Sequence, residues 1–124
     1  MSGNEALKGR RVLVVEDETM IAMLVEDMLA DLGCLVVGPA HELGAALALA
    51  GGEIIDAALL DVNLAGKPVF ALADALRARG VPMVFATGYG EASLREIDAG
   101  APVLQKPFRA ADLALALTEI LREG

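Results

Sequence analysis

The feature that most constrains this sequence is the alternation of short apolar runs with segments of helical periodicity. Each run is rich in Val, Leu, Ile or Ala, which is typical of strands buried on both faces of a parallel sheet. The alternation occurs five times, and the predicted strands are residues 12–15, 35–37, 54–60, 81–86 and 103–105. Because parallel strands need crossover connections, the pattern predicts an α/β fold, a doubly wound five-stranded parallel sheet with helices on both faces.

A helix-like segment follows every predicted strand, with apolar side chains on one face and a glycine at or near most of the ends. These segments cover residues 21–32, 43–50, 69–76, 94–97 and 113–121. Thr19 is the predicted cap of the first helix, residues 62–68 look like a loop, and Phe85 and the Met residues look like core. No linker interrupts the pattern, so we expect one domain over residues 11–122 after a flexible leader over residues 1–10.

Composition and charge exclude several classes of function. The formal net charge is −8, whereas binding to nucleic acids or anionic membranes requires a basic surface. No apolar run approaches the roughly 20 residues of a membrane span, and no signal-peptide stretch opens the sequence. Cys34 is the only cysteine, which favours a reducing compartment. We therefore expect a cytoplasmic protein without nucleic-acid or membrane partners.

The polar residues that follow the predicted strands are the candidates for chemistry. They are, in chain order, Glu16, Asp17, Asp61, Thr87 and Lys106. The carboxyl ends of parallel strands share one edge of the sheet, where ligands bind. Three carboxylates meeting there would repel one another unless a cation neutralised them, and a set of oxygen ligands suits Mg²⁺. A Thr hydroxyl and a Lys ammonium beside an ionised Asp are typical of phosphoryl transfer.

Taken in order, Glu16-Asp17, Asp61, Thr87 and Lys106-Pro107-Phe108 resemble the receiver domain of two-component response regulators, over residues 11–122. The resemblance implies a (βα)5 flavodoxin-like fold with strand order 2-1-3-4-5. It implies that Asp61 accepts a phosphoryl group from a sensor histidine kinase or phosphotransfer protein, in a phosphorelay that depends on Mg²⁺. Such a protein is a signalling module rather than an enzyme, with self-phosphorylation and autodephosphorylation as its only reactions. Its output is a protein–protein contact or service as a phosphate shuttle or sink.

The resemblance also implies a role for each matching residue. Asp17 matches the direct metal ligand, and Glu16 matches the acidic partner that reaches the metal through water. Asn63 matches the position that offers its backbone carbonyl to the metal. Thr87 matches the switch hydroxyl, and Lys106 matches the cation that pairs with the phosphoryl group.

Some positions depart from the common family pattern. Val103 stands where most receivers carry a switch aromatic, and the usual Met-Pro pair after the phosphoacceptor is absent. The segment 85–89, Phe-Ala-Thr-Gly-Tyr, resembles the FATGUY subgroup, whose members are often single-domain. Because Gly88 and the glycine after Tyr89 permit wide backbone freedom, we expect backbone rearrangement to replace ring rotation, and Tyr89 to shield the acyl phosphate. The peptide bond before Pro107 is often cis in the family, which would aim the lysine into the pocket.

Three other functions are weighed against this one. A haloacid-dehalogenase-type phosphatase also uses a strand-terminal Asp, but it usually needs a second Asp two residues later as general acid, where this chain has Asn63. A binding module that is never phosphorylated is compatible with the fold. A dinucleotide-binding domain is disfavoured because the first strand leads into Glu-Asp-Glu rather than a glycine-rich turn. His41, the only histidine, is expected to be exposed and without a role.

Overall fold

The computed structural model describes residues 5–64, 67–88 and 100–122. Its main sheet has parallel strands in the order β2-β1-β3-β6-β7. The strands of this sheet are β1 (Arg11–Val15), β2 (Leu35–Ala40), β3 (Ala57–Asp61), β6 (Met83–Thr87) and β7 (Val103–Gln105). The helices are η1 (Glu5–Leu7), α1 (Thr19–Asp31), α2 (Leu43–Gly52), α3 (Phe70–Ala78) and α4 (Ala110–Arg122). The predicted doubly wound sheet with strand order 2-1-3-4-5 is confirmed, while the helix predicted at 94–97 lies outside the described residues.

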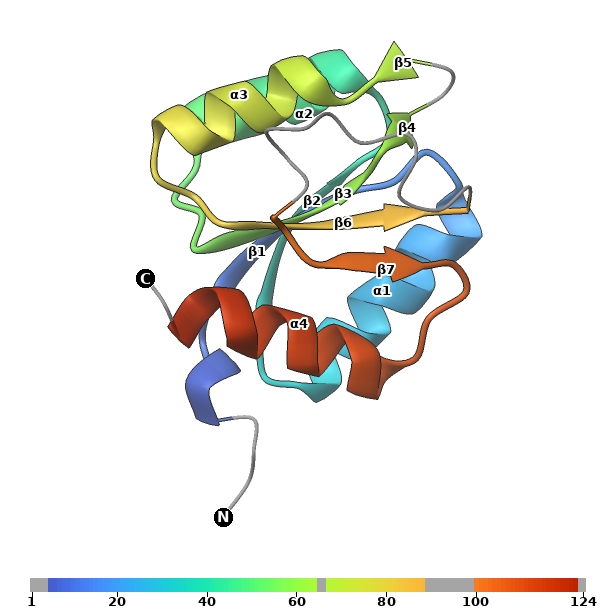
Figure 1. The fold of residues 1–124 in the computed structure, drawn as a ribbon, viewed down its shortest axis with the longest axis vertical. Coiled ribbons are helices and arrows are strands. Elements are labelled where there is room, and N and C mark those ends of the chain that lie inside the picture. The colour runs from blue at the N-terminus through green and yellow to red at the C-terminus, as the bar shows by residue number, and fades with distance from the viewer. Residues whose placement is uncertain (1–4, 65–66, 89–99, 123–124) are drawn as a thin grey trace.

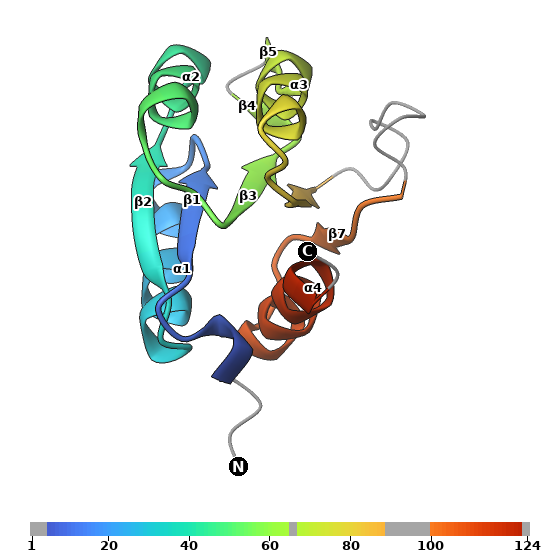
Figure 2. The same cartoon turned by 90° about the vertical axis from the view of Figure 1, so that its left-hand side faces the viewer.

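The sheet lies between two helical layers, with α2 and α3 on one face and α1 and α4 on the other (Figure 1 and Figure 2). The core on the α2–α3 side contains Leu60 and Phe85. The core on the α1–α4 side contains Leu59 and Leu117. Because side chains alternate along a strand, the adjacent Leu59 and Leu60 serve opposite cores. This two-sided burial explains why β3 is apolar from Ala57 to Leu60.

The second strand is longer than predicted, because it passes through Gly38 and Pro39 and ends at Ala40. Its register against β1 shifts there. Leu13 pairs with Val37, but Val15 pairs with Ala40, so β2 contains one more residue than β1 over this stretch. Gly38 has a φ of +97°, and a Cβ on it would lie 2.8 Å from the backbone nitrogen of Ala40. Glycine is therefore required at this bulge.

The third and fourth predicted strands correspond to β3 and β6. Both begin later than predicted and end one residue further on, at Asp61 and Thr87. The apolar residues before them lie outside the sheet, and Ile54 is 73% exposed. Hydrophobicity alone does not separate such residues from the strand that follows. The consequence for function is that Asp61 and Thr87 belong to the strands, so the backbone ladder fixes both residues.

Two connections differ from their predictions. Residues 62–68 were expected to form a loop, whereas Asn63–Leu64 (β4) pairs antiparallel with Lys67–Pro68 (β5). Thr19 was predicted to cap α1, but it is the first helical residue, and Glu18 occupies the cap position without a side-chain hydrogen bond to the first turn of the helix. Short polar runs next to a strand carry too little periodic signal to reveal such details.

The amino-terminal segment also differs from its prediction. Residues 1–10 were expected to be a flexible leader, whereas Glu5–Leu7 forms a 3-10 turn in which Leu7 is fully buried. Leu7 belongs to the core between α1 and α4. A single apolar residue in a polar stretch has no periodicity from which this packing can be predicted. Among the helices of the described segments, none is long and apolar enough to cross a membrane.

Candidate functional site

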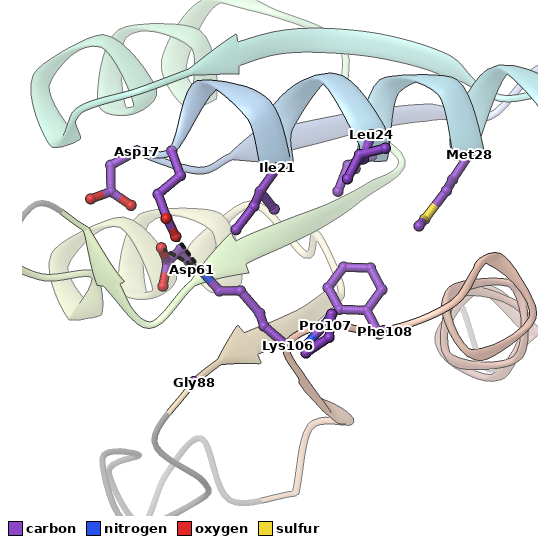
Figure 3. Close-up of a pocket in the computed structure, with 11 residues that line it drawn as sticks. Asp17, Ile21, Leu24, Met28, Asp61, Gly88, Lys106, Pro107 and Phe108 are labelled. Carbon is purple, nitrogen blue, oxygen red and sulfur yellow. Dashed lines mark hydrogen bonds and ion pairs between the residues drawn. The ribbon is translucent and has the colours of Figure 1, made fainter.

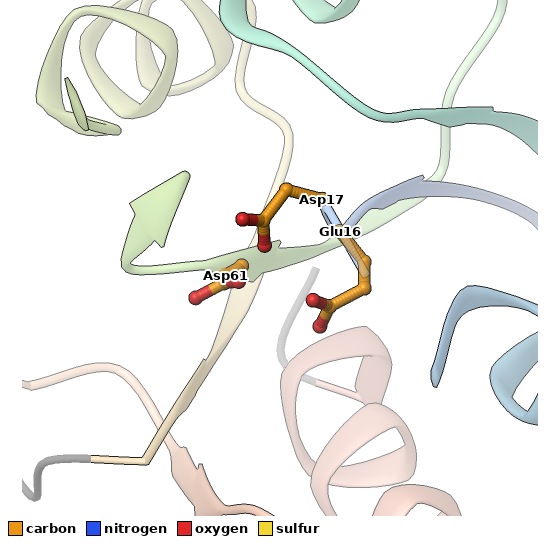
Figure 4. A group of neighbouring side chains, drawn as sticks. All are labelled: Glu16, Asp17 and Asp61. Atoms are coloured by element: carbon orange, nitrogen blue, oxygen red, sulfur yellow. The ribbon is translucent and has the colours of Figure 1, made fainter. Parts of the chain in front are cut away.

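Three acidic side chains meet at the carboxyl edge of the sheet (Figure 4). Glu16 and Asp17 follow β1, and Asp61 ends the adjacent strand β3. One carboxylate oxygen from each residue lies within 4.8 Å of the other two. Glu16 and Asp61 are only 4% and 5% exposed, and Asp17 is half-buried. The structure thus brings together the three carboxylates that the sequence placed at strand ends.

Lys106 places a positive charge inside this cluster. Its Nζ lies 3.0 Å from Glu16 Oε1 and 3.1 Å from Asp61 Oδ2. The Lys106 backbone N–H donates to the carbonyl oxygen of Thr87 at 2.9 Å, which fixes the residue against the end of β6. The bond between Lys106 and Pro107 is cis, and the lysine side chain points toward Asp61 (Figure 3).

The electrostatics of the cluster are dominated by burial. Desolvation raises the pKa of Asp61 to about 7; the hydrogen bond from Lys106 opposes this rise, and the negative charge of Glu16 adds to it. Burial by itself would lower the pKa of Lys106, but the hydrogen bonds and charges of Glu16 and Asp61 outweigh it and raise that pKa. The raised pKa of Lys106 reflects the two acidic groups around it, whereas the raised pKa of Asp61 reflects mainly its burial.

The donor set fits a small hard cation. Three carboxylates lie close together, two of them in contact with one ammonium group, and these two are almost completely removed from solvent. Buried carboxylates need a paired charge, because desolvating an unpaired ion is costly. Since all the ligands are oxygens, the site suits Mg²⁺ better than a metal that prefers nitrogen or sulfur. The predicted cluster therefore has the charge and the chemistry of a divalent cation site.

The other predicted residues that the structure describes lie around the cluster. Thr87 is 2% exposed and ends β6; its neighbour Ala86 pairs with Asp61. Asn63 begins β4, two residues after Asp61. Gly88 lines the same pocket as Asp61. Tyr89 lies outside the described residues.

Two residues near the cluster were missed by the sequence analysis. His41, expected to have no role, places its Nδ1 2.9 Å from the backbone oxygen of Glu16. Glu18 places a carboxylate oxygen 4.0 Å from Lys106 Nζ. His41 directly follows β2, but the sequence predicted that this strand ends at Val37, so the argument that selected Asp61 did not reach His41.

An apolar groove of about 730 Å³ opens beside Asp61, between α1 and the segment after β7 (Figure 3). Its apolar lining includes Ile21, Leu24, Val25, Met28, Pro107 and Phe108. Two other methionines of α1, Met20 and Met23, are 79% and 57% exposed. The prediction that the Met residues belong to the core is therefore wrong for these two. Helix α1 presents an apolar surface next to the cluster.

Residues 12–118 match the sequence model of the family described as response regulator receiver domain. This chain belongs to that family. The receiver domain is similar to SdrG from Sphingomonas melonis Fr1, with 44% identity, a TM-score of 0.81, and coverage of 98% of this chain and 99% of that one. It is also similar to the BeF3-activated conformation of SdrG from Pseudomonas melonis Fr1, with 45% identity, a TM-score of 0.75, and coverage of 90% and 95%.

The chain is also similar to two further proteins. The receiver domain of sensor histidine kinase PA1611 from Pseudomonas aeruginosa PAO1 is 27% identical, with a TM-score of 0.79 and coverage of 92% of this chain and 98% of that one. That structure holds a magnesium ion coordinated in its active site cleft. The transcriptional regulatory protein PdtaR of Mycobacterium tuberculosis H37Rv is 34% identical, over 91% of this chain and 57% of its own length. The receiver domain thus spans little more than half of that relative.

Proposed function

We propose that Asp61 accepts a phosphoryl group from the phosphohistidine of a sensor histidine kinase or phosphotransfer protein. The observation that carries this proposal is the position of Asp61 at a strand end, buried among Glu16, Asp17 and Lys106. A carboxylate oxygen of Asp61 attacks phosphorus, and the bond from phosphorus to the donor imidazole nitrogen breaks with its electron pair on that nitrogen. Lys106, already beside Asp61, then pairs with an oxygen of the phosphoryl group.

The same cluster is the proposed Mg²⁺ site. Asp17 and Asp61 would hold the cation directly, Glu16 through water, and Asn63 through its backbone carbonyl. Bound there, the cation supplies positive charge toward the carboxylates and the phosphoryl oxygens. The β4–β5 hairpin supports the role of Asn63, because this residue pairs with Pro68, which has no N–H to donate to the Asn63 carbonyl. The magnesium ion in the related PA1611 domain is consistent with this assignment.

The groove beside Asp61 supports a protein as the phosphoryl donor. A histidine on the donor must come within bonding distance of Asp61, so the donor has to cover the surface around it. The groove offers apolar side chains of α1 on one side and Phe108 on the other, a surface suited to an amphipathic helix. We propose that the donor docks here through such a helix.

We propose that output proceeds by protein–protein contacts or by use of the domain as a phosphate shuttle or sink, with autodephosphorylation as its only other reaction. The match with SdrG over 99% of that chain supports action as a single domain. The net charge of −8 favours protein partners over nucleic acid, and Cys34 as the single cysteine favours a cytoplasmic location. Val103 is half-buried, and backbone movement at Thr87 and Gly88 is the proposed signal in place of ring rotation. Tyr89 is proposed to shield the acyl phosphate.

The proposal is tested by incubating the protein with Mg²⁺ and a small phosphodonor such as phosphoramidate, and locating the product by mass spectrometry. The expected result is one added phosphoryl group on the peptide that contains Asp61. Turnover of a small phosphomonoester without a phosphorylated Asp61 would favour a phosphatase instead. Phosphate on another residue, or no incorporation, would contradict the proposal.

A further inference from the structure

The backbone of Glu16 is held on both sides by the end of β2. Its N–H donates to the carbonyl oxygen of Ala40 at 3.0 Å. Its own carbonyl oxygen lies 2.9 Å from Nδ1 of His41. A carbonyl oxygen can only accept, so the imidazole carries its hydrogen on Nδ1 in this contact. The peptide that joins Glu16 to Asp17 is thereby fixed by a side chain.

His41 takes the place of a missing main-chain donor. In a parallel ladder, a residue that donates to Ala40 would accept from the N–H of residue 42. The chain leaves the sheet before that point, because β2 ends at Ala40 and Glu42 is the N-cap of α2. Since Glu16 is only 4% exposed, water has little access to its carbonyl, and the carbonyl needs a protein donor. The Nδ1–H of His41 supplies it.

The bulge in β2 determines which residue stands beside Glu16. Because β2 gains one residue there, Ala40 rather than Pro39 pairs with Val15. His41 therefore follows at the level of Glu16. Without the extra residue, Ala40 would stand in this place, and its methyl group has no hydrogen to donate. The backbone conformation of Gly38 thus places an imidazole at the candidate site.

We propose that His41 is a positioning residue for the cation site. Its Nδ1–H fixes the Glu16–Asp17 peptide and so orients the Asp17 carboxylate toward Asp61. Flanking groups that orient metal ligands commonly change metal affinity by about 10–100-fold when they are removed. For a single hydrogen bond from an exposed residue, we expect about a three- to tenfold change. This inference rests on the proposed Mg²⁺ site.

The test compares three variants of His41. His41→Ala removes the donor and is expected to weaken Mg²⁺ binding about three- to tenfold by isothermal titration. His41→Asn places an amide N–H where Nδ1 stands and is expected to restore affinity to within about twofold of wild type. His41→Gln places its amide one carbon further out and is expected to behave like His41→Ala. Equal affinity in wild type and His41→Ala, or equal rescue by Asn and Gln, would overturn the inference.

A matched control separates positioning from stability. Glu42→Ala removes the side-chain bond to the N–H of Gly44 and weakens the cap of α2, but leaves the Glu16 carbonyl untouched. It is expected to lower the melting temperature without changing Mg²⁺ affinity. If it weakens binding as much as His41→Ala does, the effect is one of stability, and the inference fails.

A measurement on the metal-free protein distinguishes a failure of the positioning role of His41 from a failure of the proposed function. Imidazole ¹⁵N chemical shifts of the metal-free wild-type protein are expected to show the hydrogen of His41 on Nδ1 at about pH 8. A neutral ring with its hydrogen on Nε2 would contradict the positioning role even if Mg²⁺ binds. A wild-type protein that binds no Mg²⁺ while its His41 carries the Nδ1 hydrogen would contradict the proposed function instead.

Discussion

The two edges of the sheet carry charge in different ways. At the amino edge, Arg11 pairs with Glu53 at 3.2 Å, with side chains 35% and 45% exposed. At the carboxyl edge, Lys106 pairs with Glu16 at 3.0 Å, with side chains 14% and 5% exposed. The first pair is one acid with one base in contact with water. In the second, the base is shared with Asp61, and Asp17 stands close by.

The amino edge carries charges that stabilise the fold, whereas the carboxyl edge carries charges suited to binding a ligand. At the amino edge, the Arg11 backbone also donates to Asp56, and Arg79 binds carbonyl oxygens of Ala50 and Glu53 near the end of α2. Each of these contacts matches one donor to one acceptor. At the carboxyl edge, negative charge exceeds positive charge in a place with little water. Such an imbalance costs free energy of folding and is tolerated where a ligand corrects it.

The largest expected difference between the two edges is in phosphorylation. Asp61→Asn is expected to abolish phosphoryl incorporation, because the amide is not a nucleophile toward phosphorus. Asp56→Asn, at the amino edge, is expected to retain it. Phosphate incorporation measured by intact-protein mass spectrometry decides the matter. Equal incorporation in the two variants would remove the functional distinction between the edges.

Removing the base should cost much more at the carboxyl edge. Without Mg²⁺ at about pH 8, Lys106→Met is expected to lower the free energy of unfolding by about 3 kcal/mol, because it leaves buried carboxylates unpaired. Arg11→Met is expected to cost less than about 1 kcal/mol, because its ion pair is solvated. Urea denaturation gives both values. Similar losses in the two variants would show that burial does not distinguish the edges.

Metal affinity should respond only to acids of the carboxyl edge. Asp17→Ala is expected to weaken Mg²⁺ binding about 10–100-fold, because it removes a proposed direct ligand. Glu53→Ala is expected to leave the affinity unchanged. Isothermal titration of both variants sharpens the comparison, and a similar loss in each would mean that only general negative charge matters.

The pH dependence of the carboxyl edge follows from the pKa of Asp61. Because a proton and the cation compete for this carboxylate, Mg²⁺ affinity is expected to fall by up to about tenfold per pH unit below its pKa of about 7. The stability of the metal-free fold changes with pH in the opposite direction to the Mg²⁺ affinity. The folded-state pKa lies above the ordinary 3.8, so this group stabilises the metal-free fold fully below 3.8 and ceases to do so as pH rises through about 7. Two results together would contradict this pH dependence. They are a melting temperature that rises from about pH 5 to 8 in the absence of metal, and one that stays unchanged over the same range in the presence of metal.

Sequence reasoning predicted which side chains meet at the carboxyl edge better than it predicted the local details of the fold. Asp61 and Lys106 were found because strand alternation places strand ends on one edge, whatever the exact bounds of each strand. The bulge at Gly38 was missed, because a Gly-Pro pair marks a turn as often as a bulge. The contact of His41 was missed with it, since the contact depends on that register. The burial of Leu7 had no periodic pattern to reveal it.

The most direct test of the account is the initial rate of phosphorylation of wild-type protein as a function of Mg²⁺ concentration. If the buried excess of carboxylates is a cation site that makes Asp61 reactive, the rate is negligible with a chelator and saturates with Mg²⁺. The midpoint then matches the dissociation constant from isothermal titration. A rate that is the same in chelator and in Mg²⁺ would contradict the account.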